Sequence, residues 1–213
     1  MFAVGHLALG YLLARGSARL LSKKVNIPLI LMLSVLPDAD ILFSNFIEHR
    51  GPTHSVIVLS IAFLPAFAIY HKEAIPYFIA IVQHSLVGDL IAGGAVRLLW
   101  PVTTEFYGLS IGIKSSTNIM IEWLAFLISI GVMLKTSDIN KFFQPSFSNL
   151  MLAVPAFTVL LPTVLSFPML VPLWLGPPHL VYMVLFLAAT IITLYKFFKS
   201  GFRSGIGGRQ GEP

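Results

Sequence analysis

The sequence contains no cysteine among its 213 residues, and this absence excludes disulfide bonds and thiolate metal ligands. Any metal ion must therefore be bound through nitrogen and oxygen. Charged side chains are also scarce, because they make up 11% of the chain whereas 56% of the residues are hydrophobic. The mean hydropathy of +0.86 reflects more apolar side chain than one soluble core can bury. The composition predicts an integral membrane protein.

Other absences narrow the function. The chain has no internal repeat, no heptad pattern and no glycine-rich phosphate loop, since no predicted strand precedes Gly93 and Gly94. The formal net charge is +5, but the basic residues fall between apolar segments and form no patch interleaved with aromatics, so we expect no nucleic-acid partner. No basic residue precedes the first apolar run and no small-residue cleavage site follows it, so we expect the first helix to be retained.

The apolar segments predict an all-α, polytopic membrane helix bundle of six to seven helices, some of them broken by proline. A helix needs roughly 20 apolar residues to cross a bilayer. Segments of about this length cover residues 2–21, 27–46, 55–70, 75–93, 119–134, 150–175 and 179–198. The first of these either spans the membrane or lies at its interface. We expect one membrane-embedded domain over residues 1–200 and a flexible tail over 201–213.

Prolines and basic residues refine this topology. Pro37 disturbs the second segment, and the sixth carries Pro155, Pro162, Pro168 and Pro172. If the basic C-terminal tail is cytoplasmic and the segments alternate, 11 of the 14 Lys and Arg residues face the cytoplasm, and the exceptions are Arg50, Arg97 and Lys114. We therefore expect a protein of the cytoplasmic membrane with its C-terminus inside and its polar residues near the outer face.

Two short motifs concentrate ionisable residues. They read Leu36-Pro37-Asp38-Ala39-Asp40 and His49-Arg50-Gly51-Pro52-Thr53-His54-Ser55. Ionisable groups in apolar segments are costly and often mark function, and imidazole with carboxylate suits zinc, with manganese, iron or magnesium as alternatives. Asp38 and Asp40 share a face on an extended segment but diverge by about 200° on a regular helix. We favour Asp40 and His54 as metal ligands, and Asp38 as a catalytic or ligand-orienting residue.

A second group of candidates lies on other segments. His84 and Asp89 are five residues apart, which places them about 140° apart on a regular helix. A π-bulge at Gly88 would bring both side chains to one face, so that both bind the metal. Alternatively, Asp89 orients His84 from behind. His6 is also a candidate metal ligand, because it lies at the outer start of the first segment.

The remaining polar residues suggest roles around such a metal. Arg50 and His49 are candidates for substrate binding, since a guanidinium group binds phosphate through two parallel hydrogen bonds. Nonspecific contact with lipid headgroups is the alternative for Arg50. Glu122, near the start of the fifth segment, is a candidate ligand or general base. Its alternative role is a hydrogen bond to tryptophan or backbone in a neighbouring helix.

These motifs, together with Leu99-Trp100-Pro101, resemble the YdjM-like family of membrane-bound metal-dependent hydrolases over residues 1–110. That family is thought to be distantly similar to zinc-dependent phospholipase C and to single-strand nucleases that share its helical fold. The resemblance implies ligands in the order His6, Asp40, His54, His84 and Asp89. The chain departs from the family pattern at one place, because four residues separate His84 from Asp89 where the family has three.

The resemblance and the residues together favour one function. We expect a membrane-embedded hydrolase that cleaves a phosphoester of a lipid or lipid-linked substrate with metal-activated water. The alternative is a small ion-binding membrane transporter without hydrolase activity. Transporters place charged residues near the membrane midplane and often contain two similar halves. Here the polar residues gather toward one end, and no such halves are visible.

Overall fold

The computed structural model of the protein describes the backbone of residues 1–43, 45–109, 111–167 and 169–207 and the side chains up to residue 200. Within these residues it is helical, with two isolated β-bridges and no strand. The α-helices are α1 (Ala3–Leu20), α2 (Ile27–Val35), α3 (Val56–Tyr70), α4 (Ile75–Gln83), α5 (Ser116–Lys135), α6 (Ala153–Pro155), α7 (Leu161–Val164) and α8 (Gly176–Gly207). The expected all-α class is confirmed, but these eight helices differ from the expected six to seven.

The chain has more helices than expected because prolines divide one predicted segment into shorter ones. The predicted segment 150–175 is divided into a 3₁₀-helix at Phe147–Leu152, then α6, a π-helical stretch at Ala156–Leu160, and α7. Pro155 and Pro162 lack the N–H group that a regular helix needs. Pro168 lies outside the described residues. The expectation of a broken segment is thus correct, and each break adds a short element.

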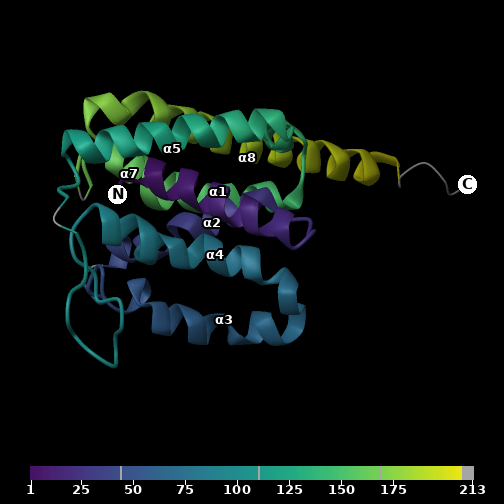
Figure 1. The fold of residues 1–213 in the computed structure, drawn as a ribbon. Coiled ribbons are helices and arrows are strands. Elements are labelled where there is room, and N and C mark those ends of the chain that lie inside the picture. The colour runs from purple at the N-terminus through teal and green to yellow at the C-terminus, as the bar shows by residue number, and fades with distance from the viewer. Residues whose placement is uncertain (44, 110, 168, 208–213) are drawn as a thin grey trace, which may run out of the picture.

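Helix α1 forms the centre of the bundle. It packs against α2 and α4 on one side and α5 on the other (Figure 1). Leu7, Tyr11 and Ala14 are completely buried in the apolar core. The first segment is therefore an internal helix that other helices surround.

Four helical segments among the described residues are long and apolar enough to cross a membrane. They are Val56–Glu73, Ser116–Lys135, Phe147–Val164 and Leu173–Ser200. The predicted span at 27–46 is instead the short α2 followed by a 3₁₀-helix at Leu36–Phe43, and the one at 75–93 is α4 continued by a π-helical turn at His84–Asp89.

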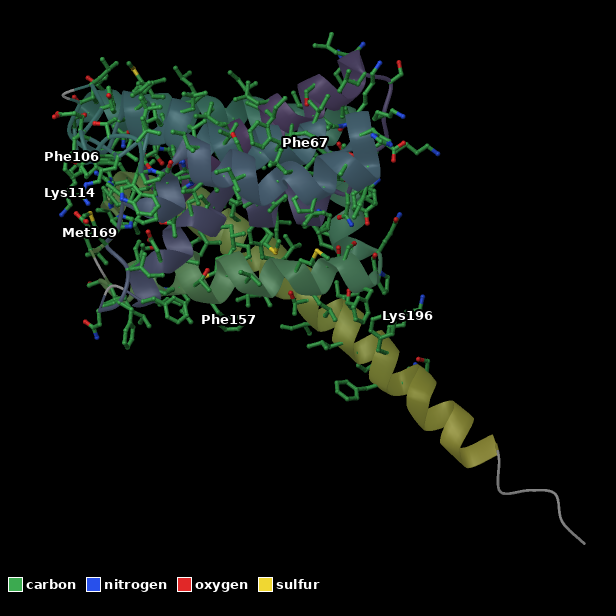
Figure 2. The ribbon with its side chains drawn as sticks, turned by 90° about the horizontal axis from the view of Figure 1, so that it is seen from below. Phe67, Phe106, Lys114, Phe157, Met169 and Lys196 are labelled. Atoms are coloured by element: carbon green, nitrogen blue, oxygen red, sulfur yellow. The ribbon has the colours of Figure 1, made fainter. Side chains whose placement is uncertain are left out.

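Successive long segments alternate in direction, so the bundle has two distinct ends. The N-terminus and the loop before α5 lie at one end, and α8 projects from the other (Figure 1). Figure 2 shows Phe106, Lys114 and Met169 at the first end and Lys196 at the second. Helix α8 continues to Gly207, and residues 208–213 of the predicted tail lie outside the described residues.

The second end of the bundle is basic and is held together by ion pairs. Arg15 and Lys141 both contact the Asp138 carboxylate, at 2.8 and 3.0 Å, and Lys23 contacts Glu73 at 3.0 Å. This end therefore carries residues that the sequence assigns to the cytoplasmic side, while the candidate site lies at the other end.

Candidate metal centre

Four separate segments bring the candidate residues together. The 3₁₀-helix after α2 carries Asp38 and Asp40, a 3₁₀-turn at Pro52–His54 carries His54, the π-helical turn carries His84 and Asp89, and α1 carries His6. Pro37 lies at the junction where α2 changes into a 3₁₀-helix. The two aspartates on this tighter helix point in different directions, since a 3₁₀-helix turns about 120° per residue.

Four donor atoms face one another at the centre, and we call them the four-donor cluster: Asp38 Oδ1, His54 Nε2, His84 Nε2 and Asp89 Oδ2. Asp38 Oδ1 lies 3.5 Å from His54 Nε2 and 3.3 Å from His84 Nε2. Asp89 Oδ2 lies 3.5 Å from His54 Nε2 and 3.6 Å from His84 Nε2. Each carboxylate oxygen therefore faces the same two imidazole nitrogens.

The four-donor cluster has the properties of a metal site. All four residues are buried, and His54 Nε2, His84 Nε2 and Asp89 Oδ2 have no hydrogen-bond partner. Unpaired buried polar atoms are costly, so such a group requires an explanation. Tetrahedral zinc with bonds of roughly 2.0–2.2 Å to nitrogen and oxygen places neighbouring donors about 3.3–3.6 Å apart. The four carboxylate–imidazole separations fall in this range. Two overlapping groups, Asp38–His54–His84 and His6–His84–Asp89, each have donor atoms within 4.8 Å of one another, so these residues could hold a metal ion.

The outer nitrogens of the imidazoles are held by other groups. His84 Nδ1 contacts the backbone oxygen of Ser34 at 2.9 Å, and His54 Nδ1 lies 3.4 Å from Asp40 Oδ2. A proton on Nδ1 leaves the Nε2 lone pair free to face the cluster. Asp40 is fixed in turn, because it accepts a 2.5 Å hydrogen bond from the Thr53 hydroxyl and lies 2.8 Å from His49 Nδ1.

The two aspartates thus occupy different places around His54. Asp38 faces Nε2 inside the four-donor cluster, whereas Asp40 stands behind the ring at Nδ1. From the sequence we expected Asp40 as the ligand and Asp38 beside it. The 3₁₀-helix turns the two aspartates to different sides. Each belongs to a group of three donors that could hold an ion, Asp38 with His54 and His84, and Asp40 with His49 and His54, so the choice of ligand stays a prediction.

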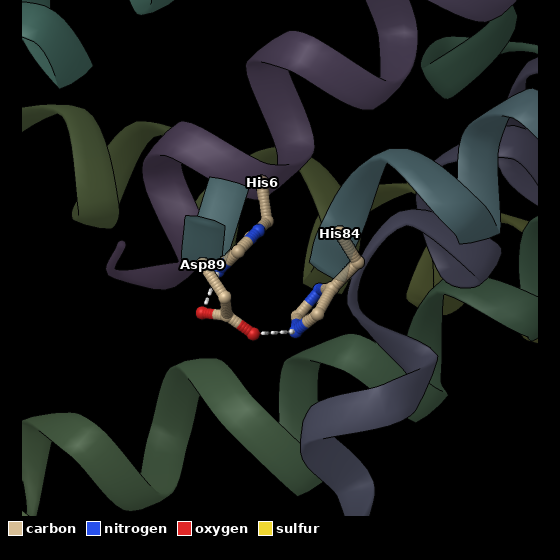
Figure 3. A group of neighbouring side chains, drawn as sticks. All are labelled: His6, His84 and Asp89. Atoms are coloured by element: carbon tan, nitrogen blue, oxygen red, sulfur yellow. Dashed lines mark ion pairs between the residues drawn. The ribbon is translucent and has the colours of Figure 1, made fainter. Parts of the chain in front are cut away.

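The π-helical turn at His84–Asp89 matches the bulge expected from the spacing of these two residues. It brings His84 Nε2 and Asp89 Oδ2 to 3.6 Å. Gly88 is needed here, because a Cβ atom at this position would lie 2.4 Å from the ring of His6. The His6 ring stacks on that of His84, with the centroids 3.7 Å apart. His6 Nε2 lies 3.6 Å from Asp89 Oδ1, so one oxygen of this carboxylate faces His6 and the other faces His84 (Figure 3).

The electrostatics of His54 show that the cluster favours positive charge. Burial alone would lower the pKa of His54, but the neighbouring carboxylates of Asp38 and Asp40 outweigh burial and raise the pKa to about 9. A proton or a cation at this position therefore compensates the surrounding carboxylates.

Arg50 and His49 lie beside the cluster. Together with Asp38 and Thr163 they form the polar part of a cavity of about 60 Å³, and the apolar part includes Phe2, Ile41, Ile113, Val159 and Met169. The Arg50 guanidinium donates a hydrogen bond to the carbonyl of Gly93. Gly93 and Gly94 have φ values of +127° and +107°, and a Cβ on Gly94 would lie 2.6 Å from Arg50 Nη1. The glycine pair thus leaves room for the guanidinium.

Glu122 faces the start of α1 instead of the four-donor cluster. Its carboxylate accepts hydrogen bonds from the backbone N–H groups of Phe2 and Gly5, at 2.8 and 3.0 Å, and from the Asn118 amide at 2.7 Å. The first N–H groups of a helix have no partner within the helix. Glu122 accepts hydrogen bonds from two of these N–H groups and so fixes the helix that carries His6. This is the alternative role expected from the sequence, a hydrogen bond to the backbone of a neighbouring helix.

The comparison with known families covers nearly the whole chain. The family described as YdjM inner membrane protein matches residues 1–200. The chain belongs to the YdjM family. The match extends well past residue 110, the limit expected from the motifs, so α5 to α8 belong to the family region too. Family membership and the four apolar segments establish an integral membrane protein of the inner membrane. Comparisons with curated proteins and with solved structures give no match.

The sequence did not predict two residues that hold the candidate metal ligands of this YdjM family member in place, Thr53 and Ser34. Thr53 has no predicted role in the sequence, although its hydroxyl, between His49 and His54, is well placed to bind the Asp40 carboxylate that both histidines approach. Ser34 contributes its backbone oxygen to His84. A backbone contact of this kind leaves no signal in the residue type.

Proposed function

We propose that this protein is a membrane-embedded, metal-dependent hydrolase that cleaves a phosphoester of a lipid or a lipid-linked substrate. The observation that carries the proposal is the four-donor cluster, in which two buried carboxylate oxygens each lie 3.3–3.6 Å from the same two imidazole nitrogens. Three of the four atoms have no hydrogen-bond partner. Zinc suits this donor set, and manganese, iron and magnesium are the alternatives.

The residues divide by what they contact. Asp38, His54, His84 and Asp89 would hold the ion, which when bound polarises a phosphoryl oxygen and lowers the pKa of water. His6 faces the second oxygen of Asp89 and would serve a further ion that shares this carboxylate.

Two carboxylates support the site from outside it. The Thr53 hydroxyl donates to Asp40, and its oxygen lies 3.0 Å from His54 Nδ1. Asp40 and Thr53 together would hold His54 in the tautomer that directs Nε2 inward. Glu122 holds the start of α1 and with it His6, which favours a positioning role over that of a general base.

The adjoining cavity suggests how the substrate is bound. Arg50 would bind the phosphate, because guanidinium matches two phosphate oxygens at once. His49, which also lines the cavity, would contribute a second polar contact. The cavity of about 60 Å³ is too small for an acyl chain, so the tail of a lipid substrate would stay in the surrounding membrane. The positive-inside bias supports a cytoplasmic C-terminus and a site toward the outer face.

The test is hydrolysis of a panel of phospholipids and lipid-linked phosphates by detergent-purified protein loaded with zinc. His54→Ala should abolish metal-dependent turnover. His71→Asn, which alters an exposed histidine beyond α3, should retain it. Circular dichroism and gel filtration establish that both variants fold. Unchanged turnover in His54→Ala would refute the proposal.

A different outcome would replace the hydrolase with the transporter. Ion flux into liposomes that is lost in Asp89→Asn, with no hydrolysis of any member of the panel, would show that the buried donors serve transport. The position of the donors at one end of the bundle, instead of midway along it, argues against this outcome.

A further inference from the structure

A second and larger cavity lies at the basic end of the bundle, away from the metal centre. Its volume is about 510 Å³, within the roughly 300–1,000 Å³ of small-molecule sites. Its walls come from α2, α3 and the start of α4: Leu29, Leu33, Phe63, Ala66, Tyr70, Ala74 and Tyr77, with Lys24, Asn26 and Glu73 as its polar members. We call it the α2–α3 groove.

The groove exists because α3 is anchored to α4 and not to α2. Three phenylalanines make this anchor: Phe63 and Phe67 of α3 pack on Phe78 of α4, with ring centroids 5.5 and 5.3 Å apart. Figure 1 shows α3 as the outermost helix on this side of the bundle. Val56–Glu73 is long and apolar enough to span a membrane, so we expect the groove beside it to face lipid hydrocarbon.

The charges at the groove are suited to an anionic headgroup. Lys24 is exposed and forms no ion pair in the part of the chain that the structure describes. Its neighbour Lys23 is paired with Glu73 at 3.0 Å, which neutralises the acidic residue of the lining. Tyr70 and Tyr77 line the same region, and tyrosine is enriched at the level of lipid headgroups.

We propose that the α2–α3 groove binds one acyl chain of an anionic glycerophospholipid, with the lipid phosphate against Lys24. The apolar walls of the groove would contact the acyl chain, and the unpaired ammonium group of Lys24 would favour an anionic headgroup. The lipid belongs to the leaflet at the basic end, so it is distinct from the proposed substrate at the other end. This inference does not depend on hydrolase activity.

The test is native mass spectrometry of protein purified in detergent and incubated with equimolar phosphatidylglycerol and phosphatidylcholine. Wild type should retain one phosphatidylglycerol in preference to phosphatidylcholine. Ala66→Trp places an indole in the groove and should remove this lipid. Leu64→Trp is the matched control, because Leu64 lies on the same helix and is 60% exposed but does not line the groove.

The headgroup is tested separately with variants that alter only surface charge. A lysine near an anionic lipid surface strengthens binding by roughly fivefold. Lys24→Gln should reduce the preference for phosphatidylglycerol by about this factor, whereas Lys72→Gln, an exposed lysine outside the groove, should not.

Three results would overturn the inference. Equal lipid retention in the Ala66→Trp and Leu64→Trp variants would exclude the groove as the site. Equal binding of phosphatidylcholine would exclude the anionic headgroup, and an unchanged preference in Lys24→Gln would exclude Lys24 as its partner. His54→Ala should bind the lipid as wild type does, so failure of the hydrolase proposal leaves this result intact.

Discussion

The different places of Asp38 and Asp40 give a prediction that separates metal ligand from supporting residue. Asp40→Asn should weaken zinc binding by roughly 10- to 100-fold, the usual effect of losing a group that orients a ligand. This corresponds to about 1.4–2.7 kcal/mol. Asp38→Asn should weaken zinc binding more than Asp40→Asn does, and it should lower the amount of metal that the protein retains through gel filtration.

The structure accounts for the difference. Asp40 Oδ1 lies 2.8 Å from His49, while Oδ2 accepts from Thr53 and lies 3.4 Å from His54 Nδ1. Asparagine keeps one acceptor oxygen and loses the charge, so His54 becomes less firmly held but remains in place. Asp38 Oδ1, in contrast, is itself one of the four donors.

The assay is a competitive titration with a chromogenic chelator, on detergent-purified protein of matched monodispersity. At saturating zinc, Asp40→Asn should reach the stoichiometry of wild type. Loss of stoichiometry in Asp40→Asn, with wild-type affinity in Asp38→Asn, would show that Asp40 is the ligand and would refute the assignment.

Three further predictions concern other parts of the structure. Glu122→Gln removes one acceptor at the start of α1, so the free energy of unfolding should fall by about 1–3 kcal/mol, and the melting temperature with it, while zinc stoichiometry is retained. Burial would raise the pKa of Asp138, but Lys141 and Arg15 outweigh it and hold the pKa below its ordinary value. Its ion pairs therefore stabilise the fold above pH about 3.9 and are lost as the pH falls through the lower folded-state pKa, so Asp138→Asn should flatten acid unfolding curves. Gly94→Ala should displace the Arg50 guanidinium and raise KM for a phospholipid without changing metal content.

The helical class and the two-ended charge distribution could be predicted because they follow from composition and from the order of the segments. The π-helical turn could be predicted as well, since five residues separate His84 from Asp89 and a glycine lies between them. The helix count could not, because each proline can either kink a helix or end it. In this chain Pro155 and Pro162 divide one expected span into short elements.

The choice between Asp38 and Asp40 depends on a detail that residue types do not encode. An extended segment would place both on one face, whereas the observed 3₁₀-helix turns them to opposite sides of His54. Glu122 illustrates a similar difficulty. A buried carboxylate on an apolar helix is expected near a reactive centre, yet this one binds the N–H groups of a neighbouring helix that lies 117 or more residues away in sequence.

The metal content of the purified protein tests the account most directly. Elemental analysis after reconstitution and removal of free metal should find at least one equivalent of zinc or another transition metal in wild type. The double variant His54→Ala, His84→Ala should retain none. Less than one equivalent in the reconstituted wild type, or equal amounts in wild type and double variant, would contradict the assignment of the four-donor cluster as a metal centre.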